Sequence, residues 1–223
     1  MPDRRTYGDS CGIARALDLA GERWALLIVR ELVLGPKRFT DLRAGLPGVS
    51  TDVLAQRLRE LEGAGLVTRR KLPPPAAARV YALTARGAEL EPVLLALGRW
   101  GSRVPLPPAS TALSPDALAI ALKTMFVGPG AAHGERRYQL LLGEHAFAIH
   151  VGASGLDIER GELASPMTTI TTDPATLTGL LWHGRALEAA LAQGLIEIDG
   201  PRSEAVYFLT LFGAGTPPGP PGQ

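Results

Sequence analysis

The sequence predicts an α+β protein of two domains, and two observations lead to this fold class. Charge divides the 223 residues into halves of opposite sign. Residues 1–103 hold 17 Lys and Arg against 11 Asp and Glu, a net charge of +6, whereas residues 104–223 hold 6 against 11, a net charge of −5. The hydrophobic pattern also changes after "VPLPPAS" at 104–110, from helical spacing to short alternating runs. We therefore expect domains at 1–103 and 111–212, a linker at 104–110 and a disordered tail at 213–223.

The first domain begins with helix signals. Within residues 11–35, apolar side chains recur at helical spacing until Gly35-Pro36 stops the run; they are Trp24, Leu27, Ile28 and Leu32. Thr40 is expected to cap the next helix, which Pro47-Gly48 ends.

A second capped helix, a hairpin and a longer helix follow. Ser50 is expected to cap helix 50–63, whose core side carries Leu54, Leu58 and Leu61. Residues 66–72 and 79–83 predict a β-hairpin around the proline-rich loop "PPPAAA". Thr84 is expected to cap a helix that runs toward Trp100, with Leu90, Leu94 and Leu97 on one side.

This order of helix, turn, helix, basic strand and returning strand is that of a winged helix-turn-helix, which places its second helix in the DNA major groove. With its leucines facing the core, helix 50–63 presents side chains that can meet DNA: Ser50, Thr51, Asp52, Gln56, Arg57 and Arg59. Gln can pair with adenine and Arg with guanine, whereas Arg57, on the flank, suits a phosphate. The alternative is a plain solvated helix face.

The hairpin supplies further cations that suit phosphate contact: Arg69, Arg70, Lys71 and Arg79. Strand alternation puts Arg69 and Lys71 on one face and Arg70 on the other, so these side chains cannot all touch DNA at once. For each single cation, a solvated surface charge is the alternative. Double-stranded DNA is the expected partner of the first domain.

Short strands between helices predict an α+β second domain with a mostly antiparallel sheet. Helices are expected to begin at Ser114-Pro115, at Asp173-Pro174, at "ALEAALAQG" and at Gly200-Pro201, the last ending near Phe212. Strands are expected in "RRYQLLL", "HAFAIHV", "GLDIER", "MTTITT" and "LIEID".

The sequence carries no recognisable catalytic set. His133, His145, His150 and His183 lack metal-ligand spacing, and Ser154 and Ser165 lack the turn context of a nucleophile. We expect no enzymatic activity, no metal and no cofactor. No apolar run reaches the ~18 residues of a membrane helix, and the N-terminus lacks a signal peptide, so a cytoplasmic protein without membrane association is expected.

Spaced signatures make the reading of the first domain more specific. They are Trp24, Arg38-Phe39, Leu46-Pro47-Gly48, Arg57-Leu58, Leu61-Glu62, Gly65-Leu66-Val67 and Leu83-Thr84. With these, residues 7–103 resemble the HxlR family of bacterial winged-helix regulators. The resemblance implies a homodimer on a palindromic operator, paired through terminal helices, here the first helix and helix 85–100. Two places depart from the family pattern: Glu22 stands where Gly is usual, and the wing reads "PPPAAARVY" instead of Pro-Pro-Arg-Val-Glu-Tyr.

Cys11 is the only cysteine, and it lies where HxlR-like redox sensors carry their sensing cysteine. Oxidation of a thiol there can alter the dimer. The alternative is a small buried residue in the dimer interface. Because the chain has no second cysteine, sensing would need a partner thiol from another subunit or a small molecule.

A second resemblance concerns residues 167–212. A Thr-rich strand before Asp173-Pro174, then Gly184, Gly194-Leu195, Ile198 and Asp199-Gly200 are similar to the C-terminal part of the sterol carrier protein type 2 fold. That resemblance implies an apolar tunnel that binds lipids or other hydrophobic molecules, and the candidate lining residues are Met125, Phe126, Phe147, Ile149, Met167, Ile170, Leu180, Leu181, Trp182, Leu187, Leu191 and Phe212. The alternative is that these side chains simply fill the core.

The function expected from the sequence is a DNA-binding transcriptional regulator, a repressor that binds as a homodimer and senses an apolar small molecule in residues 111–212. Two alternatives stay open. One is a redox regulator acting through Cys11, with a merely structural second domain. The other is a lipid carrier whose N-terminal half docks a protein partner.

Overall fold

A computed structural model describes residues 6–73, 78–104, 113–128 and 134–213. The chain divides into two compact units, Met1–Leu94 and Leu95–Gln223. Most of the expected linker at 104–110, the centre of the hairpin loop and the expected disordered tail, apart from Gly213, lie outside the described residues.

Four helices form most of the first unit: α1 (Gly12–Ala20), α2 (Ala25–Leu32), α3 (Phe39–Gly45) and α4 (Thr51–Gly63). Their apolar faces meet in one core, whose members are less than a tenth exposed; they include Ile28, Val29, Leu32, Leu42, Leu46, Leu54, Leu58 and Leu61. The predicted leucine face of α4 is therefore confirmed. Its burial fixes the rotation of α4, and hence which of its side chains reach the surface.

Two details of the helix starts differ from the sequence prediction. Trp24 precedes α2 in the left-handed region, with φ 77°, and is not part of the helix. Arg38, and not Thr40, is the N-cap of α3, because the Asp41 carboxylate accepts the Arg38 backbone N–H at 3.2 Å. Asp three residues after the cap satisfies a free N–H of the first turn as well as a capping hydroxyl does.

The hairpin is confirmed as β1 (Val67–Lys71) and β2 (Arg79–Leu83), paired antiparallel with Val67 opposite Leu83 and Lys71 opposite Arg79. Beyond it the expected single helix is two: α5 (Ala85–Ala88) and α6 (Glu91–Gly101). Thr84 caps α5, with its hydroxyl accepting the Gly87 N–H at 3.0 Å. The break follows from Pro92, which has no N–H to donate to the carbonyl of residue 88.

A buried ion pair joins the hairpin to the helices. The fully buried carboxylate of Glu31 on α2 accepts hydrogen bonds from Lys37 Nζ at 2.6 Å and from Arg30 at 2.9 Å. The backbone of Lys37 in turn exchanges two hydrogen bonds with Tyr81 of β2, at 2.9 and 2.8 Å. Lys37 therefore fixes the base of the hairpin relative to α2.

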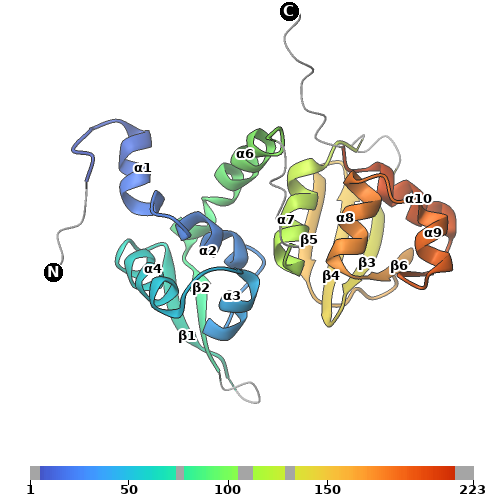
Figure 1. Cartoon of the computed structure of the whole chain (residues 1–223), viewed down its shortest axis with the longest axis horizontal. Coiled ribbons are helices and arrows are strands. Elements are labelled where there is room, and N and C mark those ends of the chain that lie inside the picture. The colour runs from blue at the N-terminus through green and yellow to red at the C-terminus, as the bar shows by residue number, and fades with distance from the viewer. Residues whose placement is uncertain (1–5, 74–77, 105–112, 129–133, 214–223) are drawn as a thin grey trace, which may run out of the picture. The chain divides into compact units, whose positions relative to one another are not determined.

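The second unit contains α7 (Pro115–Met125), β3 (Arg136–Leu142), β4 (His145–Gly152), β5 (Gly155–Arg160), β6 (Thr168–Thr172), α8 (Pro174–Trp182), α9 (Leu187–Ala192), β7 (Ile196–Asp199) and α10 (Arg202–Thr210). The strands form one sheet in the order β5-β4-β3-β6-β7. The sheet is mixed: β3 and β6 run parallel, and the other described pairs are antiparallel. Helices α7 and α8 lie side by side on one face of it (Figure 1).

Aromatic and polar contacts hold this unit together. The ring of Tyr138 on β3 packs against Phe208 of α10, with centroids 5.1 Å apart, and Phe208 packs against Phe212 at the same separation. Burial, together with the hydrogen bond that its hydroxyl donates to Glu204 at 3.0 Å, raises the pKa of Tyr138. Arg160 on β5 forms a bidentate pair with the buried carboxylate of Asp116 in the first turn of α7.

Among the described residues, no helix is both long enough and apolar enough to cross a membrane.

Candidate nucleic-acid interface

Helix α4 is the second helix of the helix-turn-helix, and its first turn is well defined. The Ser50 hydroxyl accepts the Val53 N–H at 3.3 Å, which confirms Ser50 as the cap. Three consecutive side chains of this turn, Thr51, Asp52 and Val53, are exposed. Residues near the N-terminus of a recognition helix are the ones that contact base edges in this class of motif.

Farther along α4, the predicted base-reading residues form a hydrogen-bonded set. Gln56 Nε2 donates to Glu60 at 2.7 Å, and Gln56 Oε1 accepts from the guanidinium of Arg59 at 2.6 Å. Arg59 is exposed, whereas Gln56 is half-buried. The two side chains therefore lie together on the outward face and are held in a defined geometry.

The structure gives Arg57 different neighbours from those expected for a phosphate ligand. Its guanidinium lies 3.0 Å from Glu22, in the turn between α1 and α2, and it also pairs with Glu60. Only 19% of its side chain is exposed. Because two carboxylates already hold this cation, Arg57 links α4 to the preceding turn and is not a free surface charge.

The hairpin presents its cations on two faces. Directly opposed residues of an antiparallel pair share a face, so Lys71 lies beside Arg79 and Arg69 beside Tyr81, while Arg70 lies beside Val80 on the other face. All four cations are exposed. Arg69 is partly engaged, because it lies 3.2 Å from Glu62 and its guanidinium is 5.4 Å from the centre of the Tyr81 ring. Lys71 and Arg79 are thus the pair best placed to act together on one phosphate backbone.

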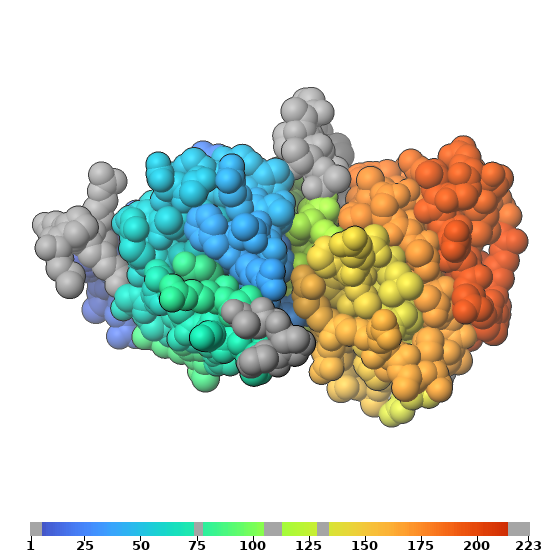
Figure 2. Space-filling view, turned by 90° about the horizontal axis from the view of Figure 1, so that it is seen from below, coloured from blue at the N-terminus to red at the C-terminus, as the bar shows by residue number. Residues whose placement is uncertain are grey.

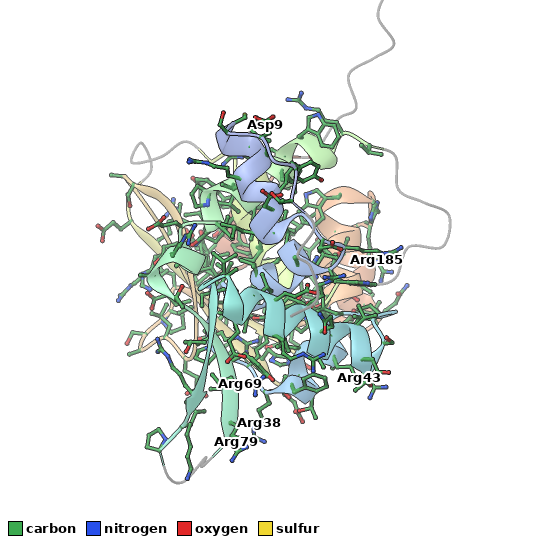
Figure 3. The ribbon with its side chains drawn as sticks, turned by 90° about the vertical axis from the view of Figure 1, so that its left-hand side faces the viewer. Asp9, Arg38, Arg43, Arg69, Arg79 and Arg185 are labelled. Carbon is green, nitrogen blue, oxygen red and sulfur yellow. The ribbon has the colours of Figure 1, made fainter. Side chains whose placement is uncertain are left out.

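Three residues that the sequence reasoning missed extend this surface. Arg38 and Arg43, at the two ends of α3, are exposed, and Figure 3 shows Arg38 near Arg79 at the hairpin. The backbone bridge between Lys37 and Tyr81 explains that proximity. Val53 is 38% exposed on the first turn of α4, where an apolar group can contact a thymine methyl. The signal for Arg38 and Arg43 was their place on the first helix of the motif.

Helices α3 and α4 and the hairpin together form the face of the first unit seen from below in Figure 2, in light blue, cyan and green. The predicted cations and the base-reading pair thus come from neighbouring elements of one folded unit. Such a surface can meet phosphates with its cations and base edges with α4.

The lone cysteine is exposed. Cys11 is the N-cap of α1, and its backbone N–H donates to the carboxylate of Asp9 at 2.8 Å; Figure 3 labels Asp9 beside α1. Exposure makes the thiol accessible to oxidants.

Two helices carry apolar side chains that are exposed to solvent among the described residues. On α1, Ile13 is 72% exposed and Leu17 is 42% exposed, one turn apart. On and after α6, exposed apolar residues recur every three or four positions: Val93, Leu97, Trp100 and Val104. Such stripes are typical of surfaces that pair with another protein.

The twelve candidate tunnel residues of the second unit differ in burial. Those within the core are Phe147, Ile149, Ile170 and Phe212. Those that are half-buried are Met125, Phe126, Leu180, Leu181, Trp182, Leu187 and Leu191. Met167 is 39% exposed. The rings of Phe126 and Phe212 meet edge to face at 6.4 Å, so part of the set is in mutual contact.

Comparison with known proteins gives one consistent result for the first unit. Residues 19–107 match the family model of the HxlR-like helix-turn-helix. The chain is 42% identical over 95 residues to the HTH-type transcriptional regulator sll1512 of Synechocystis, spanning 43% of this chain and 70% of that protein. It is 38% identical over 88 residues to the HTH-type transcriptional regulator YodB of Bacillus subtilis, spanning 40% of this chain and 79% of YodB.

Two solved structures are also similar to part of the chain. The oxidised form of the redox regulator HypR is 31% identical, with a TM-score of 0.40, over 44% of this chain and all of that one. Quinone-bound YodB from B. subtilis is 34% identical, with a TM-score of 0.36, over 41% of this chain and 97% of that one.

Proposed function

Because the chain belongs to the HxlR-like helix-turn-helix family, we propose that it regulates transcription by binding a palindromic operator as a homodimer. The observation that carries this proposal is the exposed face of α4, with Arg59 and Gln56 held together, beside a hairpin with exposed cations. In this proposal α4 lies in the major groove, where Arg59 reads a base edge, and Lys71 and Arg79 contact the backbone.

The homodimer is supported by the uncovered apolar stripes of α1 and α6. An exposed Trp100 and an Ile13 that is 72% exposed are costly in water for a monomer, and each stripe has the spacing of a helix that pairs with another helix. A two-fold symmetric pair places two copies of α4 on half-sites about one helical turn apart, or a multiple of that. Repression is the direct consequence proposed, because a dimer bound across a promoter excludes other proteins from it.

For the second unit we propose a sensor of apolar small molecules, in keeping with its resemblance to sterol carrier proteins. Helix α8 supports this, because it is apolar on nearly all sides and its last turn leaves Leu180, Leu181 and Trp182 only half-buried. The indole N–H of Trp182 is buried and has no hydrogen-bond partner among the described residues. A ligand acts on transcription only through its differential affinity for two states of the dimer, a coupling of typically ~1–3 kcal/mol.

A thermal-shift titration of the full chain with palmitate and with a fluorescent apolar dye tests the sensor. Binding should raise Tm and change operator affinity, and Leu181→Trp should abolish both effects. Val206→Trp, on the exposed side of α10, is the matched control. Ligands that neither stabilise the protein nor remain bound in native mass spectra would count against the sensor, while leaving the DNA-binding proposal intact.

The second candidate is redox regulation through Cys11. It is favoured by the exposure of this thiol and by the relatives HypR, a redox regulator, and YodB, which has been solved in a quinone-bound form. The reaction would be a disulfide between Cys11 thiols of two subunits, or between Cys11 and a small thiol, with an oxidant accepting two electrons. Intact-mass measurement after diamide treatment, with Cys11→Ser as control, distinguishes it from the apolar sensor.

Selection from a pool of random DNA duplexes by the full chain tests the function itself. An enriched inverted repeat is the expected result. Binding without any sequence enrichment would contradict an operator-reading regulator. Failure to bind DNA at all would leave the lipid-carrier alternative as the better account.

A further inference from the structure

A continuous series of side-chain contacts crosses the first unit and ends at the DNA-reading surface. It starts at Glu22 in the turn after α1, which lies 3.0 Å from Arg57. Arg57 pairs with Glu60, Glu60 accepts from Gln56 Nε2 at 2.7 Å, and Gln56 Oε1 accepts from Arg59 at 2.6 Å. We refer to these five side chains as the α4 relay.

Each contact of the α4 relay fixes the orientation of the next group. The carboxylate of Glu60 receives both Arg57 and the amide N–H of Gln56, so it is held from two sides. Glutamine has two donors on nitrogen and an acceptor on oxygen, so donating to Glu60 turns its oxygen toward Arg59. Arg59 uses one of its five N–H donors in this bond and keeps others for a base.

Arg57 and Arg59, the two arginines of the α4 relay, differ in burial. The Arg57 side chain is only 19% exposed, and its Nε has no partner among the described residues. Contact with a phosphate would require Arg57 to leave two carboxylates. Arg59, by contrast, is exposed at the end of the series. Electrostatics agree with this division, because the two arginines and two glutamates of the α4 relay sum to no net charge and add little to non-specific attraction.

We propose that Glu22, Arg57, Glu60 and Gln56 are positioning residues that hold the Arg59 guanidinium for bidentate reading of a guanine, and this proposal rests on the proposed function. A long arginine side chain loses rotamer freedom when it binds a base. Holding it in place beforehand lowers that loss for the correct base, and the benefit disappears where no guanine is present. The α4 relay therefore contributes selectivity between sequences more than overall affinity.

Glu22 supplies the one carboxylate of the α4 relay that does not lie on α4 itself. Glu22 lies two residues after the end of α1, so its pair with Arg57 connects the C-terminal end of that helix to α4.

The test uses the full chain and an operator obtained by selection from random duplexes. The base pair read by Arg59 is identified first. Substituting this pair in the operator weakens binding by the wild-type protein but does not weaken binding by the Arg59→Ala variant. At that pair, wild-type discrimination should be about 5- to 150-fold. The Glu22→Gln variant should lower this discrimination at least threefold, while discrimination at other pairs stays unchanged. Because Glu60 still pairs with Arg57 in this variant, the log–log salt slope on non-specific duplex should change by less than the ~0.9 of one added phosphate contact.

A double-mutant cycle establishes the route. In an Arg59→Ala background, Glu22→Gln should have no further effect on operator affinity, because the side chain that the relay positions is then absent. Glu62→Gln is the matched control, since it removes the same charge from a glutamate on α4 that pairs with Arg69 and not with Arg57. It should leave discrimination at the pair intact.

Unchanged discrimination in Glu22→Gln would overturn the relay, as would an equal loss of operator affinity with and without Arg59. Glu22 is 56% exposed, so the variant should fold, and melting curves verify this; Glu60→Gln provides a second break in the series. Operator selection with no dependence on Arg59 refutes the relay while DNA binding stands. Absence of any sequence-selective binding refutes the proposed function itself.

Discussion

The two faces of the hairpin differ in charge, and this difference allows a quantitative test of how the protein approaches DNA. Lys71 and Arg79 are directly opposed in the β1–β2 register and share a face, whereas Arg70 lies on the other. If the Lys71–Arg79 face meets the backbone, replacing both residues with alanine removes two phosphate contacts. Replacing Arg70 alone should then remove none.

The magnitude follows from counterion release. Each contact contributes about 0.9 to the slope of log affinity against log salt, so the double variant should have a slope shallower by about 1.8. Over a fourfold rise in salt, wild-type binding should therefore fall about 12-fold more than binding of the variant. Because phosphate contacts carry no sequence information, this loss should be the same on an operator and on an unrelated duplex.

Fluorescence anisotropy titrations at several salt concentrations measure these slopes. Arg137→Ala, an exposed cation on β3 of the second unit, is the control for a general change of charge. A slope change with Arg70→Ala and none with the double variant would refute the assignment of faces. A loss confined to one operator sequence would mean that the wing reads bases.

Three further predictions concern stability and assembly. Lys37→Met should destabilise the first unit by about 3 kcal/mol, and lower Tm by about 12 °C or more in a calorimetric scan, because it breaks the pair with the fully buried Glu31; a loss below ~1 kcal/mol would refute this. Leu97→Asp should convert the proposed homodimer to a monomer in sedimentation velocity, whereas Val127→Asp, an exposed control, should not change the assembly state. Burial alone would raise the pKa of Asp173, but hydrogen bonds from the Thr176 side chain and from backbone N–H groups lower this pKa overall. The stability that the cap contributes is therefore fully present above the unfolded pKa of about 3.9, and it is lost as pH falls through the lower pKa of the folded protein. In Asp173→Ala that part of the acid dependence should vanish at a cost of about 1 kcal/mol, seen in denaturant titrations at several pH values.

Local signals in the sequence predicted most elements because their causes are local. Ser50 and Thr84 cap their helices as expected, since a hydroxyl just before a helical run of apolar residues can accept an N–H of the first turn. The leucines of α4 and the two hairpin strands likewise follow from periodicity alone.

Two of the differences from the sequence prediction have local causes, and two depend on contacts between segments that are brought together by folding. Arg38 is the N-cap of α3 in place of Thr40, and its N–H donates to Asp41; Pro92 divides the expected helix after Thr84. Glu31 and Lys37 give no sign in the sequence that they form a buried pair six residues apart. The parallel pairing of β3 with β6 joins strands that are separated by two others along the chain, which periodicity does not report.

The sequence predicted which residues form the candidate DNA site, but it did not predict which of their side chains are held by ion pairs within the protein. A helical wheel places Gln56, Arg57 and Arg59 on or near one face, and their spacing also makes them neighbours of Glu60. The wheel does not contain Glu22, and it is Glu22 that makes Arg57 a link within the unit. The assignment of base-reading and phosphate-binding roles therefore depends on a contact between distant segments.

The central claim is that α4 of each protomer enters the major groove of one half-site, and directed cleavage measures it. Since Cys11 is the only cysteine, a Cys11→Ser, Asp52→Cys protein carries a single thiol on the first turn of α4, to which an iron chelate that cleaves DNA can be attached. On the selected operator the account predicts two clusters of cuts related by the operator dyad, with centres about one helical turn apart or a multiple of that. A single cluster, or cuts spread evenly along the duplex, would contradict it.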